Sequence, residues 1–214
     1  MPAAQFPDPR HSTEEGIVAL GGVLDPETLR AAYRQGIFPW PIPGLPLPWF
    51  CPPRRAILEF SSLHVPRRLQ RTIGQRPFRL TLDQAFDRVI EACAARHQPT
   101  WITPSMLRAY KTLHREGEAH SAEAWQGDRL VGGIYGVDAG GAFSCESMFY
   151  LVPNASKIAL LHLIEHLSSR GLDWIDIQML TPHLRSLGAR EISRDQFLER
   201  LARTQATGLR LFGQ

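Results

Sequence analysis

Three consecutive strand-like segments, joined by short turns, constrain the fold of this chain more than any other feature. The segments span residues 121–126, 130–137 and 142–150, and their residues are alternating or apolar. Gly127-Asp128 and the Asp138–Gly141 stretch separate them, and such residues favour the tight turns of hairpins. Strands joined this closely pair side by side, so the sequence predicts an antiparallel meander.

Further elements surround this meander, and their order indicates the fold. Before it we expect a strand at 78–82 and helices at 83–95 and 104–116; after it we expect a helix at 155–170, a strand at 172–178 and a helix at 194–204. The order β-α-α-β-β-β-α-β-α is used by N-acetyltransferase-like acyltransferases, whose mostly antiparallel sheet splays to admit an acyl donor. We therefore predict an α/β (α+β) fold of that kind.

A different composition precedes this part of the chain. We expect a capped helix between Asp25-Pro26 and Gly36. An Asp side chain accepts hydrogen bonds from the free backbone N–H groups of the first turn, Pro is favoured at the first helical position, and Gly is favoured after the last one. Seven prolines then lie among aromatic residues in 39–53, where we expect no regular structure. The segment is either a linker or a rigid loop folded over a site. We divide the chain into a small N-terminal domain, 1–55, with this Pro/Trp-rich loop, and a catalytic domain, 56–214.

The expected helix at 155–170 also bears on the acyl donor. Acyltransferases of this fold that use acetyl-CoA bind its pyrophosphate on a glycine-rich loop at the N-terminus of this helix. Here the junction reads Tyr-Leu-Val-Pro-Asn-Ala-Ser over residues 150–156, without glycine. An acyl-CoA donor is therefore disfavoured.

The positive charge of the chain is concentrated in one place. The 214 residues include 24 Lys and Arg against 21 Asp and Glu, a net charge of +3. Five arginines and no acidic residue lie within 64–80, which leaves 19 basic against 21 acidic residues elsewhere. This pattern indicates a phosphate-binding surface, although a solvated helix face would look the same. The five are Arg67, Arg68, Arg71, Arg76 and Arg79.

Other features narrow the protein class. No stretch approaches the roughly 18 apolar residues of a membrane helix. The three cysteines are far apart and form no CxxC motif, so neither a disulfide framework nor a thiolate zinc site is suggested. None of the 8 histidines has a metal-ligand spacing. We expect a cytoplasmic protein with reduced thiols and no membrane segment or metal.

Several short motifs together indicate a family. GIVALGG, AAYRQGIFPW, TWITPSMLRAYKTLH, GGIYGV, CESMF, NASK, IDIQ and HLRSLGAREISR occur between about residues 16 and 197. In this order and spacing they resemble leucyl/phenylalanyl-tRNA–protein transferases. The resemblance implies transfer of leucine or phenylalanine, with methionine as a further donor, from aminoacyl-tRNA to N-terminal Lys or Arg of proteins, which marks them for N-end-rule degradation. The donor is an ester on the 3′-adenosine of tRNA, so no cofactor is needed.

The resemblance also implies catalytic residues. Asp176 and Gln178 lie two apart on a predicted strand, so we expect both on the same face. By similarity, the carbonyl oxygen of Gln178 accepts a proton from the attacking amine and Asp176 holds the incoming N-terminus. Glu146 is expected to hydrogen-bond the donor or to fix the charge of the acceptor. Without the resemblance, Asp176 and Gln178 would be interpreted as a hydrogen-bonded polar pair of the sheet, and Glu146 as an edge carboxylate in a salt bridge.

Two further sets of residues are implied as binding sites for the donor. Trp40, Trp101, Tyr33 and Tyr110 match residues that contact the terminal adenosine, and stacking of a base on an aromatic ring contributes about 1–3 kcal/mol. The apolar pocket for the aminoacyl side chain corresponds to Ile134, Phe143, Met148 and Ile175. A flexible Met accommodates both Leu and Phe. On residue type alone, all of these are ordinary core residues.

The chain departs from the family pattern at two places. Cys145 stands where the family usually has glycine, and Cys51-Pro52-Pro53-Arg54-Arg55 replaces the usual Ser-Pro-Asp-Pro-Arg. One alternative is therefore a tRNA-dependent transferase with a diverged acceptor, such as a small amine or a peptide. Two other classes are an RNA-binding protein without catalysis, against which Asp176 and Gln178 argue, and a CoA-dependent acetyltransferase.

Overall fold

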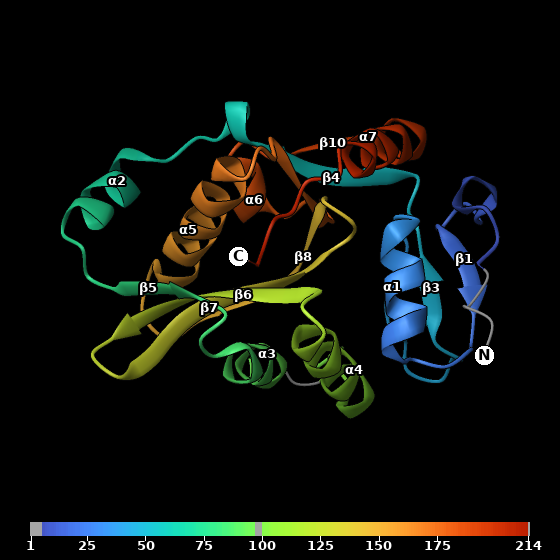
Figure 1. Ribbon diagram of the computed structural model, residues 1–214, viewed down its shortest axis with the longest axis horizontal. Coiled ribbons are helices and arrows are strands. Elements are labelled where there is room, and N and C mark those ends of the chain that lie inside the picture. The colour runs from blue at the N-terminus through green and yellow to red at the C-terminus, as the bar shows by residue number, and fades with distance from the viewer. Residues whose placement is uncertain (1–5, 97–99, 214) are drawn as a thin grey trace.

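The protein is described by a computed structural model for residues 6–96 and 100–213 (Figure 1). Its strands form two sheets. The small sheet has the order β1 (Ile17–Leu20), β3 (Pro48–Phe50), β2 (Phe38–Pro39). The large sheet has the order β10 (Arg190–Ser193), β4 (Arg54–Glu59), β9 (Trp174–Gln178), β8 (Phe143–Tyr150), β7 (Arg129–Asp138), β6 (Ala119–Gln126), β5 (Arg79–Leu82). The α-helices are α1 (Pro26–Arg34), α2 (Arg67–Gly74), α3 (Phe86–Ala95), α4 (Pro104–Arg115), α5 (Ala155–Ser169), α6 (Pro182–Ser186) and α7 (Arg194–Ala206), with 3-10 turns η1 (Pro9–His11) and η2 (Phe60–Ser62).

The predicted meander is confirmed as β6, β7 and β8, which pair antiparallel in sequence order. Helix α5 packs against β6 and β7 on one face of the large sheet, while α3 and α4 pack on the other (Figure 1). Buried apolar side chains from both sheets join in one core. The prediction of a mixed α/β fold with a mostly antiparallel sheet is therefore confirmed. The division at residues 55 and 56 stays a prediction, since the shared core does not mark it.

The large sheet has one parallel junction, between β8 and β9. Only Ser144 and Asp176 are paired there, so the two strands separate beyond this point. On the other side of β8, Tyr135 pairs with Ser147 and Gly136 with Cys145, which leaves Glu146 in a bulge between them. A bulge bends a strand and re-aims a side chain. Strand β8 therefore turns Glu146 toward the gap beside β9.

The proline-rich segment 39–53 contains regular structure, contrary to our expectation. Phe38 pairs with Phe50 and Pro39 with Trp49, which makes β2 and β3 part of the small sheet. The prolines of these strands lie at strand ends, where a missing N–H disturbs the ladder least. The predicted cap of α1 is present, since Asp25 Oδ1 accepts a 2.8 Å hydrogen bond from the backbone N–H of Thr28.

Helix α3 begins at Phe86, later than the predicted start at 83. Asp83 has a positive φ of 56°, which no helix accommodates. Its carboxylate accepts hydrogen bonds from the backbone N–H of Ser121 at 2.8 Å and pairs with Nδ1 of His120 at 2.7 Å. Contacts with β6, which sequence periodicity does not reveal, therefore set the start of this helix.

Within residues 6–96 and 100–213, no helix combines the length and apolar character needed to cross a bilayer. Cys51, Cys93 and Cys145 are buried free thiols.

Candidate active site

A cavity of about 370 Å³ opens where β8 and β9 separate. It is bounded by strands β7, β8 and β9, by helices α5 and α6, and by the segments that follow β2 and precede α4. The lining residues are Trp40, Arg96, Trp101, Ile134, Cys145, Glu146, Ser147, Met148, Leu160, Ile177, Gln178, Met179, Thr181, His183 and Leu184. One wall is mainly apolar and another carries polar groups, as is common in small-molecule sites.

Gln178 and Glu146 form a hydrogen-bonded pair in the wall of this cavity. Nε2 of Gln178 donates to Oε1 of Glu146 at 2.5 Å. The side-chain nitrogen of Gln178 is used in this bond. The side-chain carbonyl oxygen of the same amide has no donor among the described residues. Gln178 ends β9 with a positive φ of 59°, an unusual conformation for a non-glycine residue and one that is often found at functional sites.

A pair of buried tyrosines supports Glu146 from behind. The Tyr110 hydroxyl donates to Oε2 of Glu146 at 3.3 Å, and the Tyr33 and Tyr110 hydroxyls lie 2.5 Å apart. Burial raises the pKa of Glu146 to about 7, and the charge of Asp176 adds to this, whereas the tyrosine hydroxyls and Arg55 oppose it. A carboxyl group with this pKa exchanges a proton near neutral pH, as a general base requires.

Asp176 is bound within the protein. Its carboxylate accepts two hydrogen bonds from Arg55, at 2.8 and 2.7 Å, one from the Ser144 hydroxyl at 2.7 Å and one from the backbone N–H of Gln178 at 2.9 Å. The guanidinium of Arg55 lies between the rings of Phe38 and Phe197, at 4.6 and 4.4 Å. Asp176 therefore connects Arg55 to the main chain of Gln178.

The expectation that Asp176 and Gln178 share one face is wrong. Gln178 lines the cavity, whereas Asp176 lines a small enclosed space with Arg55 and Ser144. The left-handed backbone at Gln178 breaks the alternation of the strand and turns this side chain away.

Trp40 and Trp101 lie against each other in the cavity wall. Their ring centroids are 5.0 Å apart and their planes differ by 9°. Rings in direct contact leave no room for a base between them, so an adenine can stack only on an outer face of the pair.

Two family models match the chain. The model for leucyl/phenylalanyl-tRNA protein transferase matches residues 57–202, and the model for the N-terminal domain of the same proteins matches residues 22–53. The chain belongs to the leucyl/phenylalanyl-tRNA–protein transferase family. The family resemblance drawn from the sequence motifs is thereby confirmed.

Curated relatives carry the same family name. The protein named leucyl/phenylalanyl-tRNA–protein transferase of Anaeromyxobacter dehalogenans (strain 2CP-C) is 50% identical over 202 residues, which cover 92% of this chain and 87% of the relative. The protein of the same name from Pectobacterium carotovorum subsp. carotovorum (strain PC1) is 50% identical over 204 residues, which cover 94% of this chain and 87% of the relative. The protein of that name from Legionella pneumophila (strain Corby) is 48% identical over 202 residues, which cover 93% of this chain and 90% of the relative.

Of the four apolar residues inferred from this family, two line the cavity and two do not. Ile134 and Met148 line the cavity, whereas Phe143 and Ile175 are 1% and 0% exposed and do not. Phe143 instead lines the enclosed space beside Asp176. Leu160 of α5, Ile177 and Cys145 complete the apolar wall, and sequence reasoning did not assign the first two.

Tyr33 and Tyr110 also differ from their expected position. They are 2% and 0% exposed and lie behind Glu146, and neither lines the cavity. The structure therefore places them in contact with the carboxylate and its hydrogen bonds rather than at an adenosine site. Because the two tyrosines lie on different helices, α1 and α4, the sequence gave no sign that their hydroxyls are in contact.

The five arginines predicted to bind phosphate are all exposed. Arg67, Arg68 and Arg71 lie on α2, which Figure 1 shows at one end of the molecule beyond α5. Within residues 6–96 and 100–213, none of the five forms an ion pair with a carboxylate. Arg79 instead lies over the ring of Trp125, at 5.0 Å.

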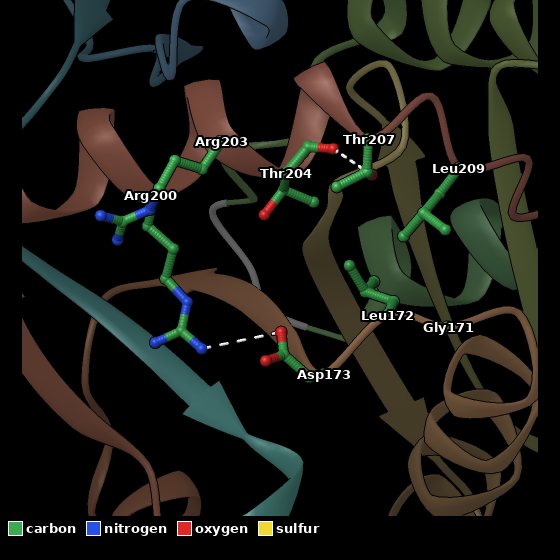
Figure 2. A pocket seen from close by; sticks show the side chains of 8 residues that line it. All are labelled: Gly171, Leu172, Asp173, Arg200, Arg203, Thr204, Thr207 and Leu209. Atoms are coloured by element: carbon green, nitrogen blue, oxygen red, sulfur yellow. Dashed lines mark hydrogen bonds and ion pairs between the residues drawn. The ribbon is translucent and has the colours of Figure 1, made fainter.

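A second hollow, of about 470 Å³, lies between α7 and the chain just before β9. Figure 2 shows Arg200 pointing toward Asp173, with the two charged groups 3.7 Å apart. Arg200 also pairs with Glu59 at 2.5 Å. Because half-buried Arg200 is neutralised by these carboxylates and the hollow is wide and open, we do not assign a site to this hollow.

Asp83, His114 and His120 bring their potential metal-ligating atoms within 4.8 Å of one another. Both ring nitrogens of His120 and Nδ1 of His114 already face oxygen atoms. His120 contacts Asp83 at 2.7 Å and the carbonyl oxygen of Gly117 at 3.1 Å, and Nδ1 of His114 contacts the carbonyl oxygen of Ala119 at 2.7 Å. A metal ion would have to displace these contacts, so we do not assign a metal site to this cluster.

Proposed function

We propose that the chain transfers leucine or phenylalanine from aminoacyl-tRNA to the N-terminal amine of acceptor proteins. Family membership carries this proposal, because relatives with this activity in their name are 50% identical over 92% of the chain. The chain is accordingly an aminoacyltransferase. A cavity that combines an apolar wall, a hydrogen-bonded Gln178–Glu146 pair and two tryptophans supports the assignment.

The donor has three parts, and the cavity offers a counterpart for each. The apolar wall around Ile134, Met148 and Leu160 receives the aminoacyl side chain, and its flexible Met admits methionine as well. The outer face of the Trp40–Trp101 pair receives the terminal adenine. The ester between them then lies beside the polar wall.

The reaction forms a C–N bond from the acceptor amine to the ester carbonyl and breaks the C–O bond to the tRNA 3′-oxygen. The carbonyl oxygen of Gln178 accepts a hydrogen bond from the attacking amine and orients its lone pair. The carboxylate of Glu146 takes the proton that the amine loses, and the same proton finally reaches the departing 3′-oxygen. A pKa of about 7 allows both steps at neutral pH.

Asp176 acts indirectly in this scheme. Its carboxylate oxygens are engaged by Arg55, Ser144 and the backbone N–H of Gln178. We assign Asp176 the role of a positioning residue that fixes the left-handed turn at Gln178, in place of a direct contact with the acceptor.

The preferred acceptors are proteins with an N-terminal Lys or Arg, which the transfer would mark for N-end-rule degradation in the cytoplasm. Glu146 is the carboxylate among the lining residues, and its negative charge favours a cationic acceptor. The five exposed arginines would bind the phosphates of tRNA, since the guanidinium suits phosphate oxygens.

A transfer assay tests the proposal. The protein is incubated with radiolabelled leucyl-tRNA and with two versions of one reporter protein, which begin with Arg or with Glu. We expect label on the Arg version only. Transfer to a small amine but to neither reporter would establish a diverged acceptor instead, and transfer to none of them would refute the proposal.

A further inference from the structure

Two basic side chains line the cavity, and a third lies on the neighbouring helix α5. Arg96 follows the last residue of α3, Lys157 lies in the first turn of α5 and His183 lies in α6. Arg96 and His183 line the cavity. Partial burial lowers the pKa of His183, and the positive charges of Lys157 and Arg96 act in the same direction.

The positive charge of this cluster is not balanced by the described part of the protein. Neither Arg96 nor Lys157 forms an ion pair with a carboxylate of residues 6–96 or 100–213. The carboxylate that lines the cavity, Glu146, is already bonded to Gln178. The cluster therefore carries unpaired positive charge beside the cavity, as an anion-binding site does.

His183 has an unused hydrogen-bonding atom. Its Nε2 is buried and has no hydrogen-bond partner among the described residues. A polar atom left unpaired costs free energy that a ligand can recover. A neutral imidazole, which the lowered pKa favours, donates one N–H to an oxygen atom.

Arg96 is held in place before any ligand arrives. One guanidinium nitrogen donates to the carbonyl oxygen of Met148 at 2.9 Å, and the group lies over the ring of Tyr150 at 4.7 Å. A guanidinium has five N–H donors, so others remain for an anion. A cation that is already fixed loses little conformational entropy on binding.

The cluster shares its cavity with the tryptophans, and its helix α5 contacts α2. Trp40 and Trp101 line the same cavity as Arg96 and His183. On the other side, Nδ2 of Asn154 lies 3.5 Å from the hydroxyl oxygen of Thr72, which brings α2 beside the first turn of α5, where Lys157 lies. A nucleic acid that leaves the cavity toward α2 therefore passes this cluster.

We propose that Arg96, Lys157 and His183 form a phosphate-binding subsite for the 5′-phosphate of the terminal adenosine of the donor. The inference rests on the proposed function, because it takes the nucleotide at the tryptophan pair to be the end of an aminoacyl-tRNA. The subsite would hold the last nucleotide by base and phosphate together, and the ester between Gln178 and the apolar wall would be positioned accordingly.

Binding of two small ligands tests the subsite without relying on activity. Adenosine 5′-monophosphate and adenosine differ only in the phosphate, so the ratio of their dissociation constants, measured by calorimetry, reports this contact alone. We expect the wild type to bind the monophosphate about tenfold more tightly. In Arg96→Met and in Lys157→Met the ratio should fall toward one, while adenosine binds as before. Arg170→Met, at the exposed far end of α5, is the matched control and should keep the full ratio.

An equal affinity of the wild type for the two ligands, or no measurable binding of either, would overturn the inference, as would an unchanged ratio in both variants. Unaltered adenosine binding shows that a variant has folded, and the second variant serves if the first has not. A parallel assay with leucyl-tRNA separates the two proposals. Transfer without a phosphate effect refutes the subsite alone, whereas a phosphate effect without transfer refutes the proposed function.

Discussion

Nε2 of Gln178 lies 2.5 Å from Oε1 of Glu146, although the two residues belong to strands that share a single paired position. The separation of β8 and β9 that opens the cavity is thus bridged by these side chains. The bulge at Glu146 and the left-handed backbone at Gln178 turn them toward one another. One irregular region of the sheet therefore creates both the space for the donor and the polar pair beside it.

Replacement of Glu146 by Gln should remove the group that accepts the proton of the amine. We expect kcat/KM to fall by about 10²–10⁴-fold, the usual contribution of a general base. In the wild type kcat/KM should rise with pH through about 7, the pKa of Glu146. The α-amino group of the acceptor has a pKa of about 7.7–8.0, so its deprotonation also raises kcat/KM with pH. In Glu146→Gln the rise near pH 7 should disappear, while the rise caused by the amine should persist. An unchanged pH profile would exclude Glu146 as the base.

The same substitution should stabilise the fold in alkaline solution. The pKa of Glu146 rises from 4.5 to about 7 on folding, so the folded state binds the proton more tightly and stability falls as pH rises between these values. Glu146→Gln removes this loss. Urea unfolding should therefore show a larger gain in free energy of unfolding at pH 8 than at pH 5.5. A gain that is equal at both pH values would contradict the raised pKa.

The buried pair of Arg55 and Asp176 should be strongly coupled. Arg55→Met leaves a buried carboxylate without its cation, and we expect a loss of about 3–5 kcal/mol in the free energy of unfolding. Asp176→Leu should cost a similar amount. The double variant should lose clearly less than the sum of the two, because no unpaired charge remains. Strict additivity in denaturant unfolding would show that the two residues act independently.

Cys145 should limit the size of the side chain that the cavity accepts. It lines the apolar wall at a position where the family usually has glycine. Cys145→Ala should raise kcat/KM for phenylalanyl-tRNA relative to leucyl-tRNA, by roughly up to tenfold, as one atom in an apolar pocket allows. Cys51→Ala, a buried cysteine away from the cavity, should leave the ratio unchanged. An equal ratio in all three proteins would refute the role of Cys145.

The arginines of α2 should make tRNA binding dependent on salt. Each phosphate contact contributes about 0.7–0.9 to the slope of log K against log salt concentration. Arg67→Met/Arg71→Met should therefore flatten this slope by roughly 1.5. Arg170→Met/Arg203→Met removes the same charge from exposed positions after α5 and on α7 and should leave the slope unaltered. Equal slopes for the two double variants would place tRNA on another surface.

Local signals predicted much of the fold. The turn residues between the meander strands and the cap Asp25 act over a few residues, so the sequence reports them directly, and this cap is present. The late start of α3 and the strands within the proline-rich segment depend on partners distant in the chain. Strand β10, which pairs with β4, also escaped prediction because its four residues lack a distinctive pattern.

The candidate site was predicted in its residue types more than in its geometry. Motifs identified Gln178, Glu146 and the tryptophans, all of which line the cavity. They gave no sign that Arg55, 121 residues before Asp176, would occupy that carboxylate. Such a contact depends on β4 lying beside β9, a pairing that no local pattern encodes.

The most direct test compares the wild type with Gln178→Ala in transfer of radiolabelled leucine from tRNA to a reporter protein with N-terminal Arg. At saturating leucyl-tRNA, we predict that Gln178→Ala transfers at least about 100-fold more slowly, because the amine loses its orienting acceptor. Gln126→Ala, an exposed glutamine on β6, should match the wild type. Transfer by Gln178→Ala at the wild-type rate would contradict the assignment of this cavity as the site of aminoacyl transfer.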